Sequence, residues 1–290
     1  MGLQVTRLAN STVLPAPREC LLSKDEEGMY LTTYGEDVFE RRPFLNVGAG
    51  DFRHPAWRNL DFYTDAYASD VRSNMDIEMD LSNMERWPIP DNSIEAIFTS
   101  HTIEHLRDDH DRHIFEESLR VLKPGGVIRV TCPDIELYFR AMRRGDRHFF
   151  LNYAPTWVNE DIEQLFLREF ATQISTANND GLPISKVTSK EIVDVFNAMN
   201  MEDGLSEFSR RIDYKTWYKL APGNHVNWWS YDKLFRFLRD AGFGEMYRSG
   251  FGQSLCRPMR SPLFDWTAKN ISLYAEAFKP LSGDATIPNG

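Results

Sequence analysis

The sequence of 290 residues has few cysteines, no long apolar run and no excess of positive charge. Its three cysteines, Cys20, Cys132 and Cys256, are odd in number and far apart, which excludes a disulfide framework and a zinc site built from cysteine alone. No apolar stretch approaches the ~18 residues that cross a bilayer, and the first residues lack the apolar core of a secretion signal. We therefore expect a cytoplasmic protein without a transmembrane segment.

Negative charge exceeds positive charge, since the sequence has 33 Lys and Arg and 43 Asp and Glu, which gives a formal net charge of −10. Nothing global in such a chain attracts a polyanion, so we expect no nucleic-acid partner. Hydrophobic residues make up 42% of the sequence, and the length is that of one large domain or two small ones. The oligomeric state is left open by the sequence.

Short apolar runs alternate with helical patterns along much of the chain. Residues 44–47 end at Gly48-Ala49-Gly50, which predicts a buried strand that enters a tight glycine turn. Further strands are predicted at 59–61, 94–99, 127–132, 245–249 and 271–278, with helices at 102–121 and 230–241. Strands that alternate with helices in short units imply a mostly parallel sheet covered by helices, so we expect an α/β fold.

A stretch of different character interrupts this pattern. Residues 135–229 follow a helical period and are rich in aromatic side chains, as expected of an inserted lid or cap. In the N-terminal segment we expect a helix and a strand. The predicted division is an N-terminal arm at 1–43, the first part of the core at 44–134, the helical insertion at 135–229, the last helix and an antiparallel strand pair at 230–279, and a tail at 280–290.

The glycine turn differs from the common phosphate-binding turns. A dinucleotide site has a third glycine where this chain has Arg53, and its acidic residue comes ≈ 20 residues later, whereas Asp61 comes much sooner. The Gly-Lys-Ser/Thr of a P-loop is absent. Two glycines let the backbone approach a ligand closely, and Asp61 at the tip of the next strand offers a carboxylate to both ribose hydroxyls. The pattern favours a nucleoside without phosphate.

Six segments occur in one order at compact spacing: FLNVGAG, Asp61, Asp80-Leu81, WPIPDNSIEAIFTS, HTIEHL and LRVLKPGGVIRV. This arrangement resembles the class I S-adenosylmethionine-dependent methyltransferases, over about residues 44–134 and again at 230–279. The resemblance implies a Rossmann-like, seven-stranded, mostly parallel sheet with helices on both faces. It implies S-adenosylmethionine as cofactor, S-adenosylhomocysteine as product, and a cofactor site of Asn46, Gly48, Gly50, Asp61, Asp80, Leu81 and Ser100.

The gap between Gly50 and Asp61 is shorter than the family's usual first helix requires, so we expect a loop or a single turn there. A subgroup of methyltransferases associated with polysaccharide and cell-envelope gene sets has a similar gap and a last strand that resembles ISLYAEAFK. This likeness implies O-methylation of a sugar or glycan intermediate in polysaccharide biosynthesis. Two alternatives stay open: a methyltransferase acting on a small aromatic molecule or a protein side chain, and a nucleoside-binding protein without catalysis.

Methyl transfer to a hydroxyl benefits from a base that works near pH 7, for which histidine is the usual choice. His101 follows the strand at 94–99, at the edge where open α/β sheets bind ligands. His225 stands where the insertion returns to the core. We predict His101 as the catalytic base, with His225 as the second choice.

His101, Glu104 and His105 also supply the donor types of a divalent metal site, with His110 and His113 nearby. Small-RNA methyltransferases carry a related cluster at this point, but this sequence has His101 where they have Glu, and its acidity disfavours RNA. We therefore expect no metal.

Overall fold

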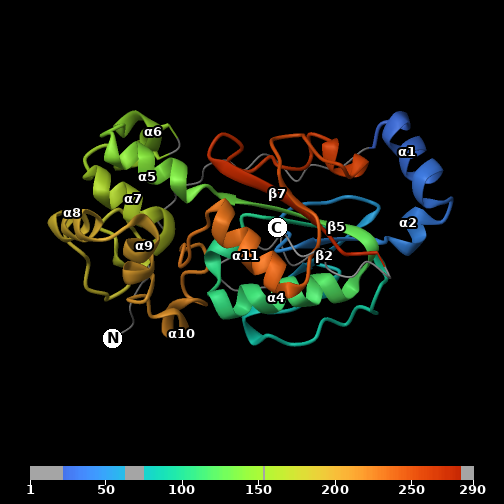
Figure 1. Ribbon diagram of the computed structural model, residues 1–290, viewed down its shortest axis with the longest axis horizontal. Helices are drawn as coiled ribbons and strands as arrows, with labels where there is room; N and C mark the ends of the chain where they lie inside the picture. Colours follow the sequence, from blue (N-terminus) through green and yellow to red (C-terminus); the bar gives the residue numbers. More distant parts are fainter. Residues whose placement is uncertain (1–21, 63–74, 153, 282–290) are drawn as a thin grey trace, which may run out of the picture.

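The computed structural model describes residues 22–62, 75–152 and 154–281, and these form a seven-stranded sheet beside a body of helices (Figure 1). The strand order is β3-β2-β1-β4-β5-β7-β6. The strands are β1 (Phe44–Val47), β2 (Trp57–Asp61), β3 (Ile77–Glu78), β4 (Ile94–Ser100), β5 (Leu122–Pro133), β6 (Met246–Arg248) and β7 (Ser272–Phe278). Only β7 is antiparallel to its neighbours, β5 and β6. The predicted fold class is confirmed.

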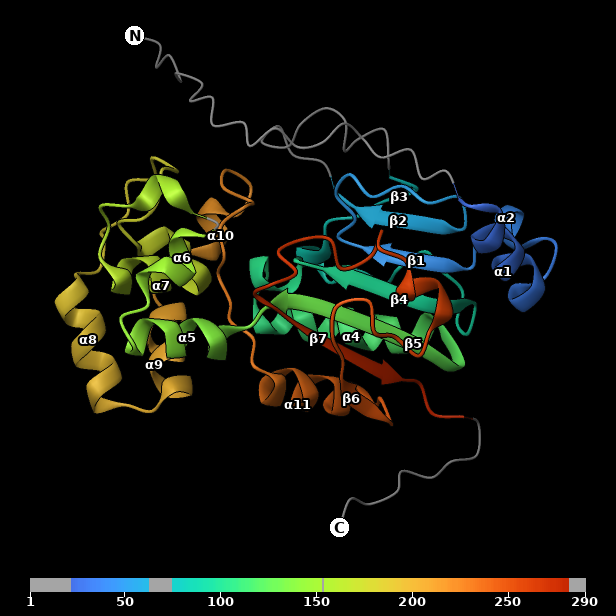
Figure 2. The same cartoon turned by 90° about the horizontal axis from the view of Figure 1, so that it is seen from above.

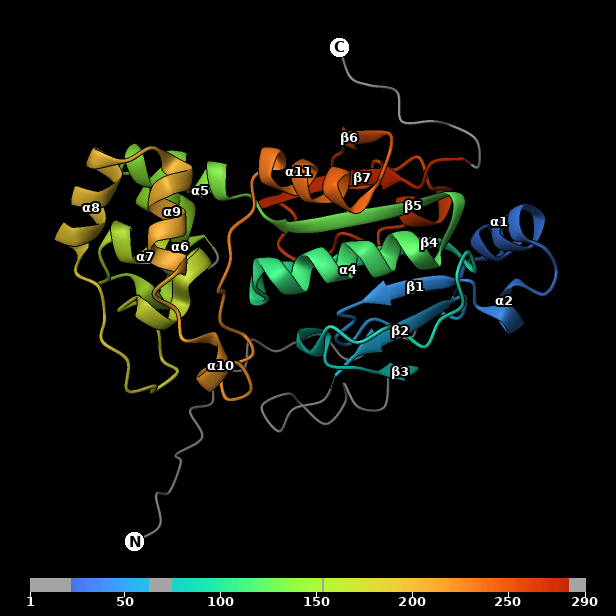
Figure 3. The same ribbon diagram turned by 60° about the horizontal axis from the view of Figure 1, so that its bottom comes forward.

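Two long helices, α4 (Asp108–Val121) and α11 (Tyr231–Ala241), pack together on one face of the sheet (Figure 3). The ends of α11 are set by its sequence: the Ser230 hydroxyl accepts from the Lys233 backbone N–H, and Gly242 takes the left-handed conformation that ends the helix. The prediction of one helix over 102–121 is wrong at its start. A 3₁₀ turn, η2 (Ile103–His105), comes first, and the extended Leu106 separates it from α4.

On the opposite face no helix follows the glycine turn, in agreement with the short gap between Gly50 and Asp61. The aromatic rings of Phe44 and Trp57 are covered there by Tyr30 and Phe264. Tyr30 comes from α1 (Lys24–Tyr34), which is followed by α2 (Val38–Arg41). The N-terminal segment is therefore packed on the sheet, and the strand expected in it is not found within residues 22–43; residues 1–21 lie outside the described residues.

The helical insertion comprises α5 (Ile135–Arg143), α6 (Arg147–Leu151), α7 (Ile162–Ala171), α8 (Ser189–Ala198), α9 (Met201–Ser209) and α10 (Tyr214–Trp217). It has its own core, in which Tyr138, Phe150, Phe166, Phe170 and Phe208 are buried together. Figure 2 shows this body beyond the carboxyl ends of β1 and β2. Most aromatic residues of the insertion therefore stabilise the insertion itself, and it faces the edge of the sheet where the glycine turn lies.

Short 3₁₀ segments complete the described elements: η1 (Leu81–Asn83), η3 (Pro155–Trp157), η4 (Thr172–Ile174) and η5 (Arg257–Arg260). None of the described helices is both long and apolar enough to span a bilayer. The predicted alternation of the last strand is confirmed, since Leu273, Ala275 and Ala277 enter the core beneath α4 and α11. Glu276 points to the other face, where it pairs with Arg129. The predicted tail is described only as far as Leu281.

Candidate functional site

The two glycines of the turn after β1 have different surroundings. Both take left-handed backbone conformations, with φ of 68° at Gly48 and 54° at Gly50. A Cβ on Gly48 would lie 2.2 Å from Thr102 Oγ1, so this glycine is required by close packing against the turn after β4. A Cβ on Gly50 would meet no atom within 4 Å. The second glycine thus borders open space that a ligand can enter.

Asp61 ends β2 directly beside this turn. Its Oδ2 accepts a hydrogen bond from the Gly50 backbone N–H at 2.7 Å, and its Oδ1 accepts one from the Phe62 N–H at 2.8 Å. Burial raises the pKa of Asp61, while these backbone donors oppose the rise. The carboxylate is held at the mouth of the turn, with lone pairs remaining for a ligand's hydroxyl groups.

One cavity of about 330 Å³ brings together most of the predicted cofactor residues. Gly48, Gly50, Asp61, Leu81, Ser100 and the predicted base His101 all line it. We call it the donor cavity. Sequence reasoning missed the other side of this cavity, to which the chain around the insertion contributes Gln173, Tyr214, Tyr218 and Asn224. The only signal for them was the aromatic content of that stretch, which did not indicate which rings face the sheet.

Two predicted cofactor residues lie beside the donor cavity rather than in its lining. The Asp80 carboxylate accepts from the Ser82 backbone N–H at 3.0 Å and from the Tyr218 hydroxyl at 3.3 Å, and so connects η1 to the insertion. Asn46 is buried and lines a neighbouring cavity of about 360 Å³, together with Phe52 and Trp266. The geometry therefore separates these two residues from the five cofactor residues that line the donor cavity.

His101 follows β4 with a φ of 52°, a left-handed conformation that directs the chain into η2. Its Nδ1 lies 3.1 Å from Glu104 Oε1, and its Nε2 lies 2.7 Å from Ser272 Oγ. Because a carboxylate only accepts, Nδ1 carries a hydrogen that points to Glu104. Burial alone would raise the pKa of Glu104, but the neighbouring His101 outweighs it and holds the pKa at about 2. Glu104 and His101 thus form an oriented carboxylate–imidazole pair at the donor cavity.

The second candidate base, His225, lies next to His105 instead, with ring centroids 4.9 Å apart. His105 Nδ1 contacts the Asn224 carbonyl oxygen at 3.1 Å, and His225 Nδ1 contacts the Glu169 carbonyl oxygen at 2.8 Å. Burial lowers the pKa of His105 to about 4 and also lowers the pKa of His225. Both rings are therefore neutral at pH 7, and His225 does not line the donor cavity.

His225 lines a separate cavity of about 430 Å³, which we call the polar cavity. Its lining includes Trp157, Arg168, Asn178, Asn179 and Asp180. Ala221, Gly223 and Asn224 belong to the walls of both the polar cavity and the donor cavity. The two cavities therefore adjoin along the segment that leads from α10 back to the sheet.

Comparisons with known proteins agree with this geometry. Residues 45–130 match the family model of a methyltransferase domain. A probable S-adenosylmethionine-dependent methyltransferase of Mycolicibacterium smegmatis is 31% identical over 102 residues, which are 34% of this chain and 39% of the relative. The match thus spans well under half of that protein's length.

The solved structures to which the chain is similar have low sequence identity and TM-scores below 0.5. A possible histamine N-methyltransferase from Thermotoga maritima is 14% identical, with 88% of this chain and 95% of that chain covered and a TM-score of 0.38. A methyltransferase dependent on S-adenosylmethionine from Aquifex aeolicus is 12% identical, with 88% and 89% covered and a TM-score of 0.37.

The residues matched by the family model include the glycine turn, Asp61, Leu81 and the turn from His101 to His105. This part of the chain is similar to methyltransferase domains that depend on S-adenosylmethionine, and the cofactor of such domains is S-adenosylmethionine. The donor cavity fits this cofactor: Gly50 leaves backbone exposed where a side chain would obstruct it, Asp61 offers a carboxylate to a ribose, and Leu81 offers an apolar wall.

Proposed function

We propose that this chain transfers the methyl group of S-adenosylmethionine to a hydroxyl of a sugar or glycan intermediate. The observation that carries the proposal is that Gly50, Asp61 and the Glu104-oriented His101 meet at one cavity. A nucleoside held by Asp61 and a hydroxyl approached by His101 would then lie within one cavity. Excluding water there favours an in-line displacement, since the reacting groups need mainly to be held in place.

S-adenosylmethionine supplies, when bound, a methyl group already activated by its sulfonium. The role of His101 is to accept the acceptor hydroxyl's proton at Nε2 while the oxygen–carbon bond forms and the sulfur–carbon bond breaks. Glu104 stabilises the resulting imidazolium through Nδ1. Ser272, whose hydroxyl contacts Nε2, occupies the place that the acceptor hydroxyl takes in this scheme.

The polar cavity supports a sugar as the acceptor class. It combines the flat ring of Trp157, on which a sugar ring can stack, with the amide groups of Asn178 and Asn179 and the guanidinium of Arg168. Its shared wall with the donor cavity would bring a sugar that binds there close to the transferred methyl group. Amide and guanidinium groups pair well with hydroxyl groups and with the phosphate or carboxylate of an activated sugar.

The test is labelling with S-adenosylmethionine that carries an isotopic methyl group. The full chain is incubated with a panel of nucleotide sugars, lipid-free oligosaccharides, catechols and proteins, with and without sinefungin as a competitor for the donor. We expect label in a carbohydrate fraction, and we expect sinefungin to remove it. Label that enters only the catechols or the proteins would contradict the sugar assignment, and no label in any fraction would contradict methyl transfer to these classes.

The two glycines provide a prediction that separates folding from ligand binding. Gly50→Ala should cost only about 1 kcal/mol of unfolding free energy, because an alanine at positive φ is strained but meets no neighbour. Its Cβ enters the donor cavity, so affinity for S-adenosylhomocysteine should fall about tenfold or more.

Gly48→Ala should instead destabilise the fold by about 3 kcal/mol, because backbone strain adds to the clash with Thr102. Urea denaturation and calorimetry measure both; equal effects of the two variants would contradict this division.

His101→Ala should lower kcat by about 100-fold or more while affinity for S-adenosylhomocysteine changes little, because the imidazole is assigned to proton transfer. Steady-state kinetics and calorimetry on the same preparation check this split. The matched control is His148→Ala, which removes an exposed histidine from α6 and should leave both values unchanged. Full turnover in His101→Ala would show that the assignment of the base to His101 is wrong.

A further inference from the structure

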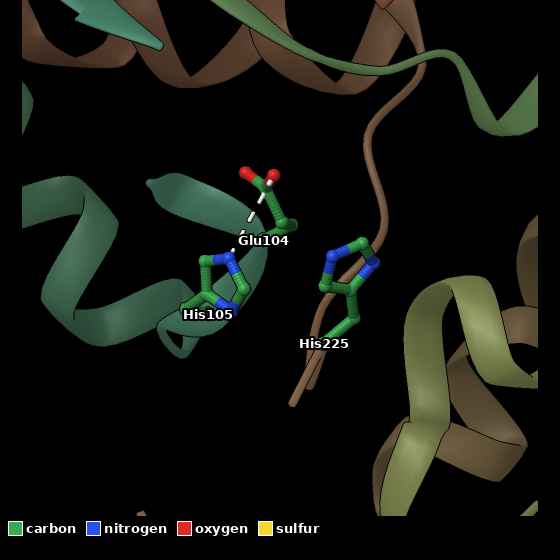
Figure 4. A group of neighbouring side chains, drawn as sticks. All are labelled: Glu104, His105 and His225. Atoms are coloured by element: carbon green, nitrogen blue, oxygen red, sulfur yellow. Dashed lines mark ion pairs between the residues drawn. The ribbon is translucent and has the colours of Figure 1, made fainter. Parts of the chain in front are cut away.

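Glu104, His105 and His225 form a cluster that the donor cavity does not explain. Glu104 and His105 come from η2, and His225 comes from the segment after α10. One ligand atom from each of the three lies within 4.8 Å of the other two. Figure 4 shows the Glu104 carboxylate beside the two imidazole rings, with a ring nitrogen of each turned toward the carboxylate.

The hydrogen bonds of the two histidines determine which nitrogen faces the cluster. Each Nδ1 lies against a backbone carbonyl oxygen, that of Asn224 for His105 and that of Glu169 for His225. A carbonyl oxygen only accepts, so each Nδ1 donates its hydrogen there and Nε2 is the nitrogen left to face Glu104. Histidines that bind metals are typically held in this way, with the outer nitrogen donating to a carbonyl or carboxylate and the inner one free to coordinate.

The Glu104 carboxylate is also a buried group with few close partners. Its side chain is 2% exposed, and its close polar partner among the described residues is His101 Nδ1, 3.1 Å from Oε1. The contact from His105 Nε2 to Oε1 is 3.9 Å, which is too long for a hydrogen bond. A buried carboxylate with one imidazole as its close partner is stabilised further by a cation beside it.

We propose that Glu104, His105 and His225 bind one divalent transition-metal ion. Two imidazoles and one carboxylate favour Zn²⁺, Mn²⁺, Fe²⁺ or Co²⁺ over Mg²⁺ and Ca²⁺, which prefer oxygen ligands alone. The sequence by itself led us to expect no metal, because His101 stands where the related cluster has Glu and the acidity of the chain disfavours RNA. Only the structure shows that His225 lies beside Glu104 and His105.

Three protein ligands leave coordination positions for water or for a substrate oxygen. His105 lines the donor cavity and His225 lines the polar cavity, so the ion lies at the boundary of the two. This assignment rests on the proposed function: the ion holds the acceptor hydroxyl and lowers the pKa of that hydroxyl. A lower pKa makes transfer of the hydroxyl proton to His101 easier.

The experiment uses the full chain after treatment with a chelator and titrates it with Co²⁺, read by absorption spectroscopy, followed by displacement with Zn²⁺ in a calorimeter. Neither S-adenosylmethionine nor a sugar acceptor is present in these titrations. We expect one Co²⁺ per chain, and we expect Zn²⁺ to displace it. His225→Ala should bind Co²⁺ about 100-fold more weakly, whereas the matched control His148→Ala should bind it as the wild type does.

Two outcomes would overturn the metal site: wild-type protein that takes up no stoichiometric Co²⁺, and a His225→Ala variant that binds it as tightly as the control. His225→Gln, which retains a polar side chain, replaces His225→Ala if the latter does not fold, as judged by circular dichroism. Binding of S-adenosylhomocysteine is measured in parallel. If the protein binds S-adenosylhomocysteine but takes up no Co²⁺, the metal site is refuted and the proposed function stands. If it takes up Co²⁺ but does not bind S-adenosylhomocysteine, only the proposed function is contradicted.

Discussion

Asp61→Ala is expected to weaken binding of S-adenosylhomocysteine by at least ~100-fold while the protein stays folded. In the proposed function the carboxylate at the end of β2 accepts the ribose hydroxyls. Charge-assisted hydrogen bonds contribute ~1.5–3 kcal/mol each, so the loss of two accounts for this factor. The fold should tolerate the change, because burial raises the pKa of Asp61 and its charge is therefore kept at a cost in stability. Calorimetry with S-adenosylhomocysteine and thermal unfolding measure the two effects.

The matched control is Glu78→Gln on β3. Glu78 is paired in register with Asp61 on the neighbouring strand, but its side chain is exposed and does not line the donor cavity. This variant should bind S-adenosylhomocysteine as the wild type does. Unchanged affinity in Asp61→Ala, with the control also unchanged, would show that the ribose is held elsewhere.

Arg129→Ala is expected to give the largest loss of stability, about 3–5 kcal/mol of unfolding free energy. The Arg129 guanidinium on β5 is fully buried and pairs with the buried carboxylates of Asp265 and Glu276. It also donates to the carbonyl oxygens of Gly250 and Gln253. Removing it leaves two buried carboxylates without their cation and removes the anchor of the chain between β6 and β7. Urea denaturation at pH 7 measures the loss.

Arg210→Ala is the control, since Arg210 forms an exposed ion pair with Glu207 at the end of α9 and should cost less than ~0.5 kcal/mol. If Arg129→Ala loses less than about 1 kcal/mol of unfolding free energy, the buried ion pairs of Arg129 do not anchor the chain between β6 and β7.

The elements of the sheet were largely predictable from local patterns. The apolar run before Gly48 indicated β1, which is buried at all four positions, and the alternation that ends in Phe278 indicated β7. The helix at 102–121 was predicted too long, since the periodicity of α4 hides the left-handed residue His101 and the extended Leu106 that precede it. The sequence analysis did not single out Arg129, and only the structure shows that it pairs with Asp265 and Glu276.

The sequence alone determined what lies close along the chain: the glycine turn, the aspartate at the end of the next strand, and the histidine after β4. These follow from backbone requirements and from the shared edge at which parallel strands end. Only the tertiary structure decided that Tyr218 and Gln173 close the donor cavity and that His225 meets Glu104 and His105. The reason is that helical periodicity identifies only the apolar face of an inserted helix. Which strand end that helix packs against depends on shape and on polar pairing between residues more than 100 positions apart.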